Sequence, residues 1–213
     1  MAEPLRLRPG RPGPVQQDVN DCGPTALATA RMLRDPELLQ WIRTGEFAGR
    51  AFPAELGSSA ARFAAYVELV HARTNGAVGP GGRLQVPWPR ALGTSPWGFC
   101  RELEARGSAP ESRYRWVVVR WCGPDVLRAR LRQLASHVGD GRPAGLYVGS
   151  RWLPRHVALL VPDGQGGLLV HDPADGTVRA LEVTELADHR PGIGGWTHAW
   201  MIAGPVGAPL ANR

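Results

Sequence analysis

Apolar and small residues recur at helical spacing through the first half of the chain. This spacing predicts helices over residues 22–33, 36–43, 58 or 59 to 74, 96–105 and 124–137. In the first of them Cys22, Ala26 and Ala30 share one face, and Asn20 and Asp21 are candidate caps. Pro residues stand in the first turns of several of these segments, where a missing backbone N–H costs nothing. The N-terminal half is therefore predicted to be mainly helical.

β-branched, aromatic and apolar runs follow in the second half. They predict strands over residues 114–121, 144–149, 156–161, 168–171, 177–183 and 196–203. The third and fourth of these runs are joined by the turn residues PDGQGG, which favours a β-hairpin. Helices followed by strands predict an α+β domain, in which an N-terminal helix packs on a C-terminal antiparallel sheet.

Turn-forming residues mark the limits of this domain. Residues 1–14 are rich in Pro, Gly and Arg and predict a flexible, extended arm. Residues 15–205 have a length that suits one domain, and residues 206–213 remain as a tail. The stretch 76–98 holds so many Gly and Pro residues that it predicts a long loop, and loops of this length are often functional.

Composition and charge exclude several classes of protein. The 213 residues carry 25 Lys+Arg, all of them Arg, and 19 Asp+Glu. Because this positive charge is spread along the chain, we expect no nucleic-acid partner. No apolar run reaches the roughly 18 residues of a membrane helix, so we expect no membrane partner and a cytoplasmic location. The three cysteines have no paired spacing, which suits a reducing compartment and predicts neither a metal site nor a cofactor.

The segment QQDVNDCGPTAL, residues 16–27, places Cys22 at a predicted helix start. Unpaired backbone N–H groups and the positive end of the helix dipole stabilise a thiolate at such a position. Cys22 is therefore a candidate nucleophile. The alternative is a small buried residue that packs the start of the helix, since free cysteines are among the most buried residues.

The segment RHVALLVPDGQGGLLVHDP supplies an imidazole and a carboxylate. If the hairpin turn centres on Gly164, His156 stands directly opposite Asp172. Directly opposed residues have Cβ atoms about 5 Å apart, so Asp172 could orient the ring of His156. The other ring nitrogen would then be free to meet a thiol, as a thiolate–imidazolium pair requires.

Acyl transfer also needs donors for an oxyanion. An amide side chain just upstream of the cysteine can serve beside the cysteine's own backbone N–H. Gln16 and Gln17 are the candidates, and either could instead be a solvated polar residue.

Gln16, Cys22-Gly-Pro, the His156-Val strand and the Asp172-Pro turn occur together in an order that resembles the papain-like cysteine peptidases of the bacteriocin-processing type. That family removes leader peptides after a double glycine and is often fused to export transporters. The resemblance covers about residues 15–35 and 124–176, and residues 40–120 form an atypical middle segment. It implies a papain-like fold, with Cys22 as nucleophile, His156 as base, Asp172 as orienting acid and Gln16 as oxyanion donor.

The predicted function is thus that of a cysteine peptidase acting on a peptide or protein substrate. A thiol acyltransferase, transglutaminase-like or deamidase-like effector of the same fold is an alternative, because the same residues serve both hydrolysis and transfer. A catalytically silent domain that binds a peptide or protein is a second alternative. The oligomeric state and the natural substrate stay open.

Several residues compete with the predicted site. Cys122-Gly-Pro repeats the CGP motif at a predicted helix start, but the residue six positions upstream is Trp116 and not an amide. Cys100 is expected in the core. His171 should point away from the face that carries the base, and Asp175 is a turn former before it is a substitute for Asp172. The remaining histidines are expected in structural or solvated positions, namely His71, His137, His189 and His198.

Overall fold

The computed structural model describes residues 3–46, 57–139, 141–190 and 192–207 and confirms the α+β class. Six helices lie within those ranges: α1 (Cys22–Met32), α2 (Pro36–Thr44), α3 (Ser59–Asn75), α4 (Pro96–Glu102), α5 (Pro124–His137) and α6 (Val183–Ala187). Six strands form one sheet: β1 (Tyr114–Val118), β2 (Ala144–Gly149), β3 (Pro154–Pro162), β4 (Leu168–His171), β5 (Val178–Ala180) and β6 (His198–Pro205). A π-helical turn, Leu103–Gly107, continues α4.

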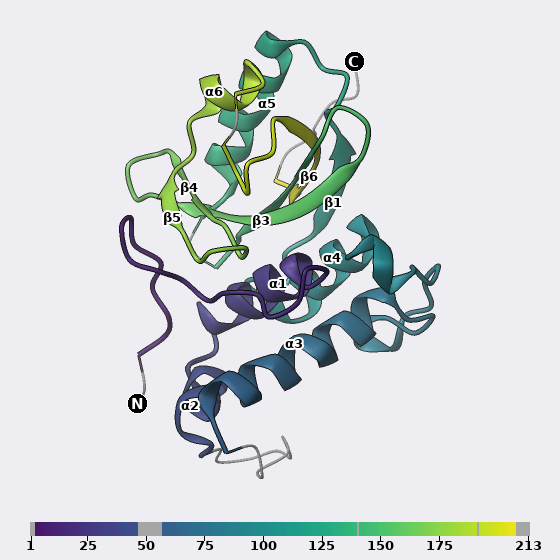
Figure 1. Cartoon of the computed structure of the whole chain (residues 1–213), viewed down its shortest axis with the longest axis vertical. Helices are drawn as coiled ribbons and strands as arrows, with labels where there is room; N and C mark the ends of the chain where they lie inside the picture. The colour runs from purple at the N-terminus through teal and green to yellow at the C-terminus, as the bar shows by residue number, and fades with distance from the viewer. Residues whose placement is uncertain (1–2, 47–56, 140, 191, 208–213) are drawn as a thin grey trace.

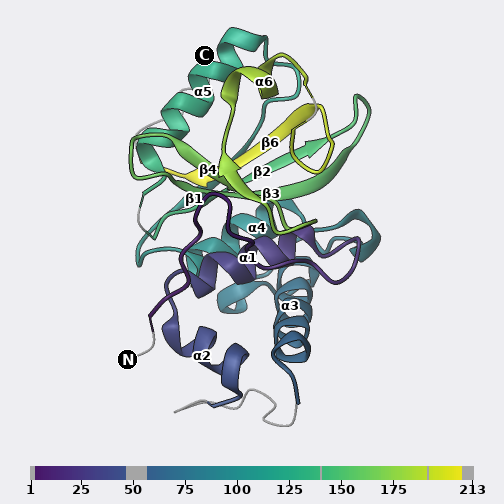
Figure 2. The same cartoon turned by 60° about the vertical axis from the view of Figure 1, so that its left-hand side comes forward.

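The sheet separates two groups of helices (Figure 1). Its strand order is β1-β6-β2-β3-β4-β5, and every neighbouring pair is antiparallel. Helices α1 to α4 lie on one side, and α5 and α6 lie on the other, as the turned view also shows (Figure 2). Each face of the sheet has its own apolar cluster. Consequently β2 is buried along its whole length, which explains its continuous apolar sequence AGLYVG.

Helix α1 is the most enclosed helix of the N-terminal half. Ten of its eleven residues are buried, and Arg31 is the exception. Most of the buried residues are small, so the helix can approach β3 on one side and α3 on the other. The first residue of α1, Cys22, is thereby brought against the sheet.

Local signals fix where the other N-terminal helices begin. The side chains of Asp35, Ser58 and Ser95 accept hydrogen bonds from backbone N–H groups in the first turns of α2, α3 and α4. Each bond satisfies a donor that the helix leaves unpaired. These starts agree with the sequence-based prediction.

The N-terminal arm is extended and lies against the domain. Backbone N–H groups of Leu5, Gly10 and Gly13 donate to carbonyl oxygens of Met32, Val178 and Gly176. The arm therefore runs beside β5 and the turn that precedes it. Within the part of the chain that the structure describes, no helix is both long and apolar enough to cross a membrane. Residues 1–2 of the arm, 47–56 of the middle segment and 208–213 of the tail lie outside the described residues.

The hairpin register differs from the prediction by two residues. Leu159 pairs with His171 and Leu160 with Val170, so the turn centres on Gln165 and not on Gly164. The carboxylate of Asp163 accepts hydrogen bonds from the N–H groups of Gln165 and Gly167, which stabilises the longer turn. The expected direct pairing of His156 with Asp172 was therefore wrong.

The predictions for two strands and two helices also need correction. Strand β1 ends at Val118 and β5 at Ala180, each earlier than expected, and the predicted fifth strand gives way to α6 at Val183. In α5 the buried residues are Leu127, Leu131 and Leu134. Val126 is half exposed because it lies outside the face that meets the sheet. Helix α4 ends at Glu102, where the backbone changes to the π-helical turn.

Candidate active site

Cys22 begins α1 and is 4% exposed. It therefore lies among the backbone N–H groups that the first turn of a helix leaves without intrahelical partners. The next residue, Gly23, is tightly enclosed, because a Cβ atom there would lie 2.4 Å from the hydroxyl oxygen of Thr94. The long middle loop thus packs directly against the start of α1, and only a glycine leaves room for it.

His156 and Asp172 are in contact despite the shifted register. The Nε2 atom of His156 lies 2.6 Å from Oδ1 of Asp172. With the observed pairing, Asp172 is two positions from the residue opposite His156, and such diagonal neighbours on one face remain within reach of long side chains. A register error of one residue would have placed the carboxylate on the other face.

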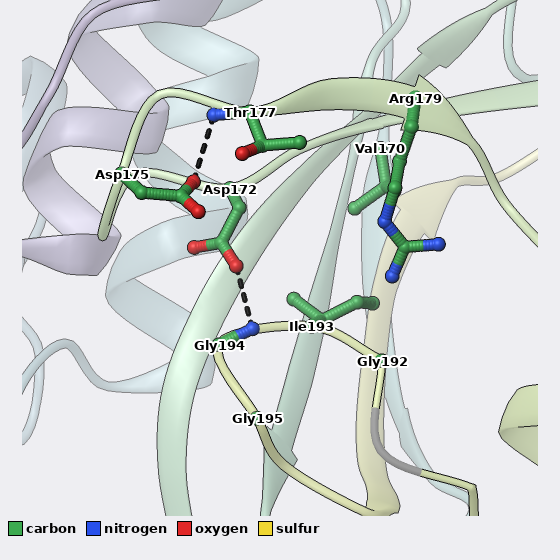
Figure 3. Close-up of a pocket in the computed structure, with 9 residues that line it drawn as sticks. All are labelled: Val170, Asp172, Asp175, Thr177, Arg179, Gly192, Ile193, Gly194 and Gly195. Atoms are coloured by element: carbon green, nitrogen blue, oxygen red, sulfur yellow. Dashed lines mark hydrogen bonds between the residues drawn. The ribbon is translucent and has the colours of Figure 1, made fainter.

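Three N–H groups from separate segments reach the carboxylate of Asp172. Besides His156, the backbone N–H of Ala174 donates to Oδ1 at 3.0 Å and that of Gly194 to Oδ2 at 2.6 Å. Figure 3 shows the bond from Gly194, which comes from the loop that precedes β6. Burial alone would raise the pKa of Asp172, but these hydrogen bonds and the charge of His156 lower it. Asp172 is consequently held as a carboxylate.

The ring of His156 lies between Asp172 and Cys22. It is 6% exposed and is hydrogen-bonded to the Asp172 carboxylate, and the Cys22 side chain lies close enough to act on its pKa. Burial would lower the pKa of His156, but these two partners together raise it to about 9. The imidazole is therefore protonated at neutral pH.

The two candidate glutamines have different surroundings. The backbone N–H of Gln16 donates to the carbonyl of Pro173 at 2.8 Å, which ties Gln16 to the residue after Asp172. Its side-chain oxygen is buried and has no hydrogen-bond partner among the described residues. The side chain of Gln17 instead donates to the carbonyl of Ala60 on α3. Gln17 thus contacts a helix that carries none of the other candidate residues.

The competing residues lie elsewhere or serve packing. Cys100 is buried, and burial raises the pKa of its thiol to about 12. Cys122 lies just before α5, on the side of the sheet away from α1. His171 is fully buried, and its Nε2 lies 2.9 Å from the carbonyl oxygen of Pro14 in the arm. The carboxylate of Asp175 accepts the N–H of Thr177 within its own turn.

A second buried histidine–carboxylate pair was not expected. His71 of α3 is 2% exposed, and its Nδ1 lies 3.0 Å from Oδ1 of Asp21, the residue before Cys22. Of the structural and solvated positions expected for His71, the structure therefore shows the structural one, near the end of α3. The carboxylate of Asp21 does not cap α1, because it turns to His71 and lies 3.6 Å from Arg90. The helical spacing that placed Val67 and Val70 inward also placed His71 beside them, which was the available signal.

A pocket of about 250 Å³ lies beside Asp172 and is lined from β5, the preceding turn and the loop before β6. Figure 3 shows Arg179 reaching into it across from Asp172, with Ile193 and Gly194 below. Of the four candidate site residues only Asp172 lines it. Within the described ranges no three His, Cys, Asp or Glu side chains are grouped as metal ligands would be.

Loss of His71 should destabilise the domain, because it leaves the buried carboxylate of Asp21 without its main partner. We expect His71→Ala to lower the free energy of unfolding by about 3 kcal/mol, measured by urea denaturation. In the double variant His71→Ala/Asp21→Asn the loss should be smaller than the sum of the single losses, since the unpaired charge is gone. A loss below about 1 kcal/mol in the single variant would contradict the stabilising role of the pair.

The His156 ring should make stability depend on pH. Its pKa of about 9 lies above the value near 6.5 of an unfolded chain, so its stabilisation is complete below about pH 6.5 and is lost as the pH rises through about 9. We expect the free energy of unfolding to fall over this interval by no more than about 3 kcal/mol. Urea titrations at several pH values test this. In His156→Gln this part of the decrease should disappear, and an unchanged slope would disprove the assignment.

Comparisons with known proteins give distant structural likenesses and no likeness in sequence. No family model matches the sequence, and no curated protein matches it. Among solved structures, the Pseudomonas avirulence protein AvrPphB aligns with a TM-score of 0.48 and 14% identity, over 91% of this chain and 96% of that one. A likeness at this level carries no argument about function, so the case for the site rests on the residues of this chain.

Proposed function

We propose that this protein is a papain-like cysteine peptidase that hydrolyses a peptide amide with Cys22, His156 and Asp172. The observation that carries the proposal is the position of the His156 ring, which is hydrogen-bonded to Asp172 and lies near Cys22 at the start of α1. The packing of α1 against β3, which joins nucleophile and base, supports the papain-like assignment. Core packing, the alternative role of a buried cysteine, does not call for an imidazole held in this way.

In the proposed reaction the Cys22 thiolate attacks the carbonyl carbon of the substrate. The proton on His156 passes to the leaving amine as the C–N bond breaks, which leaves a thioester on Cys22. A water molecule then gives a proton to His156 and attacks the thioester, and the C–S bond breaks to release the acid. Asp172 keeps the ring oriented and stabilises the imidazolium at each stage.

The backbone N–H of Cys22 and the side-chain amide of Gln16 are the proposed donors to the oxyanion. The anchoring of Gln16 to Pro173 supports this role, because it links Gln16 to the same turn that holds Asp172. The side-chain oxygen of Gln16 has no hydrogen-bond partner among the described residues. This also supports the role, because the oxygen does not hold the amide group in another orientation.

The resemblance to the bacteriocin-processing type suggests the first substrates to test. Gln16, the CGP motif, His156 and the Asp172-Pro turn are the residues that support this finer assignment. Peptides cleaved after a double glycine are therefore the first choice. The three cysteines are free, which supports placing the protein in a reducing compartment such as the cytoplasm.

The reactivity of Cys22 tests the proposal directly. We expect iodoacetamide to label Cys22 at about pH 6 at least about ten-fold faster than Cys100 or Cys122, because only Cys22 faces a protonated imidazole. Mass spectrometry of the labelled peptides measures the three rates in one sample. His156→Ala should remove the advantage of Cys22. Equal labelling of Cys22 and Cys122, or no effect of His156→Ala, would refute the peptidase.

Gln16 and Gln17 provide a matched pair for the oxyanion donor. We expect Gln16→Ala to lower kcat on a cleaved peptide by about 100-fold, as loss of one oxyanion donor does, with little change in KM. Gln17→Ala is the control and should stay within about three-fold of wild type. A larger loss of kcat at Gln17 than at Gln16 would show that Gln17 is the oxyanion donor and that the proposed assignment to Gln16 is wrong. Adding an acceptor amine to the same assay separates hydrolysis from acyl transfer.

A further inference from the structure

Aromatic and basic side chains gather at one end of the sheet, close to His156. The cluster is formed by two loops and the start of one strand, and we call it the Trp–Arg surface: Arg120, Trp121, Arg151, Trp152, Leu153 and Trp200. Trp121 is 81% exposed, Trp152 73% and Leu153 50%. So much exposed aromatic surface in one place is typical of an interaction site.

The Trp–Arg surface is a connected unit. The Arg120 guanidinium lies 5.4 Å from the centre of the Trp200 ring, and it also donates to the carbonyl of Arg151 at 2.9 Å. Trp121 contacts the Trp200 ring edge to face at 6.3 Å, and the indole N–H of Trp200 donates to the carbonyl of Ser150. These contacts join the loop after β1, the β2–β3 loop and β6, so the surface is preorganised.

The Trp–Arg surface is positively charged, and no acidic residue of its own segments neutralises it. The segments 116–123, 149–156 and 196–201 contain Arg120, Arg151 and Arg155 and no Asp or Glu. Among the described residues none of these three arginines forms an ion pair, and the buried Nε of Arg120 has no hydrogen-bond partner. Burial lowers the pKa of nearby His198, and the charges of His189, Arg120 and Arg151 lower it further.

The Trp–Arg surface adjoins the proposed active site. Trp152 and Leu153 belong to the β2–β3 loop, which projects from the sheet in both views (Figure 1, Figure 2), and His156 follows on the same hairpin. Trp152 lies in the bend before β3, four residues from His156, and four residues span at most about 14 Å. A bound peptide therefore needs at most about four extended residues to cover that distance.

From these observations we propose that the Trp–Arg surface binds a segment of the peptide substrate that carries acidic and apolar residues, within about four residues of the scissile bond. The proposal rests on the peptidase function and adds the substrate class. Arginines lying against tryptophan rings keep their guanidinium edges available for carboxylates, and tryptophan and arginine are the residues that most often dominate binding energy.

Binding of two matched peptides to the Cys22→Ala variant tests the proposal without turnover. The fluorescein-labelled peptides share length and the same Leu and Tyr residues, and differ in having Glu or Lys at the remaining positions. We expect the Glu peptide to bind at least about ten-fold more tightly in fluorescence anisotropy. Arg151→Glu and Trp152→Ala should each weaken it by about ten-fold.

Matched control variants lie on α5, which packs on the sheet away from α1. Arg132→Glu and Val126→Ala change exposed residues of the same kinds and should leave binding within about two-fold. Equal binding of the two peptides, or equal losses in the α5 variants, would overturn the proposal. Tighter binding of a single-stranded DNA oligonucleotide than of the Glu peptide would also overturn it and indicate a nucleic-acid surface.

Failure of this proposal is distinguishable from failure of the proposed function. If Cys22 is labelled as predicted and the Glu and Lys peptides bind equally, the surface proposal fails and the peptidase remains. If Cys22 is inert and the Glu peptide still binds through Arg151 and Trp152, the peptidase fails, and with it the assignment of the ligand as a substrate. In an active peptidase, Arg151→Glu should raise KM for an acidic substrate and leave kcat unchanged.

Discussion

The buried carboxylate of Asp172 is the constraint on which the site depends. A carboxylate removed from water is tolerated only when hydrogen bonds replace its hydration. Here the donors come from β3, from the turn after β4 and from the loop before β6, so one side chain ties together three segments that are distant in sequence. The same turn also holds Gln16 through the carbonyl of Pro173. The positions of the candidate base and of the candidate oxyanion donor thus follow from the need to replace the hydration of one carboxylate.

Features with a local cause could be predicted from the sequence. Helix starts at Pro36, Pro96 and Pro124 follow from capping residues and from proline in the first turn, and the buried strand AGLYVG follows from its uniform apolarity. The contact between His156 and Asp172 was predicted from a register that proved wrong by two residues. The contact forms nevertheless, because a register shift of two residues keeps both side chains on one face of the sheet. The roles of Cys22, His156, Asp172 and Gln16 remain predictions.

Features that depend on distant segments could not be predicted. The sequence around Asp21 predicts a helix cap. Nothing near it indicates that its carboxylate will instead pair with His71, fifty residues later. The attachment of the arm to β5 uses backbone groups, which have no side-chain signature. The helix α6 is short, and its β-branched residues Val183 and Thr184 favour a strand when read alone. Tertiary contacts decide such cases.

The N-terminal arm connects the start of the chain to the turn that follows Asp172. Gly13 and Gln16 are tied to the turn that carries Asp172, and Cys22 follows a few residues later. A protease that cut the arm between these bonds would disconnect Gln16 from the bond at Gly13 while leaving α1 and the sheet in place. A bulky fusion to this end would strain the same bonds. The arm therefore constrains the position of Gln16, the candidate oxyanion donor, although it contributes neither the candidate nucleophile nor the candidate base.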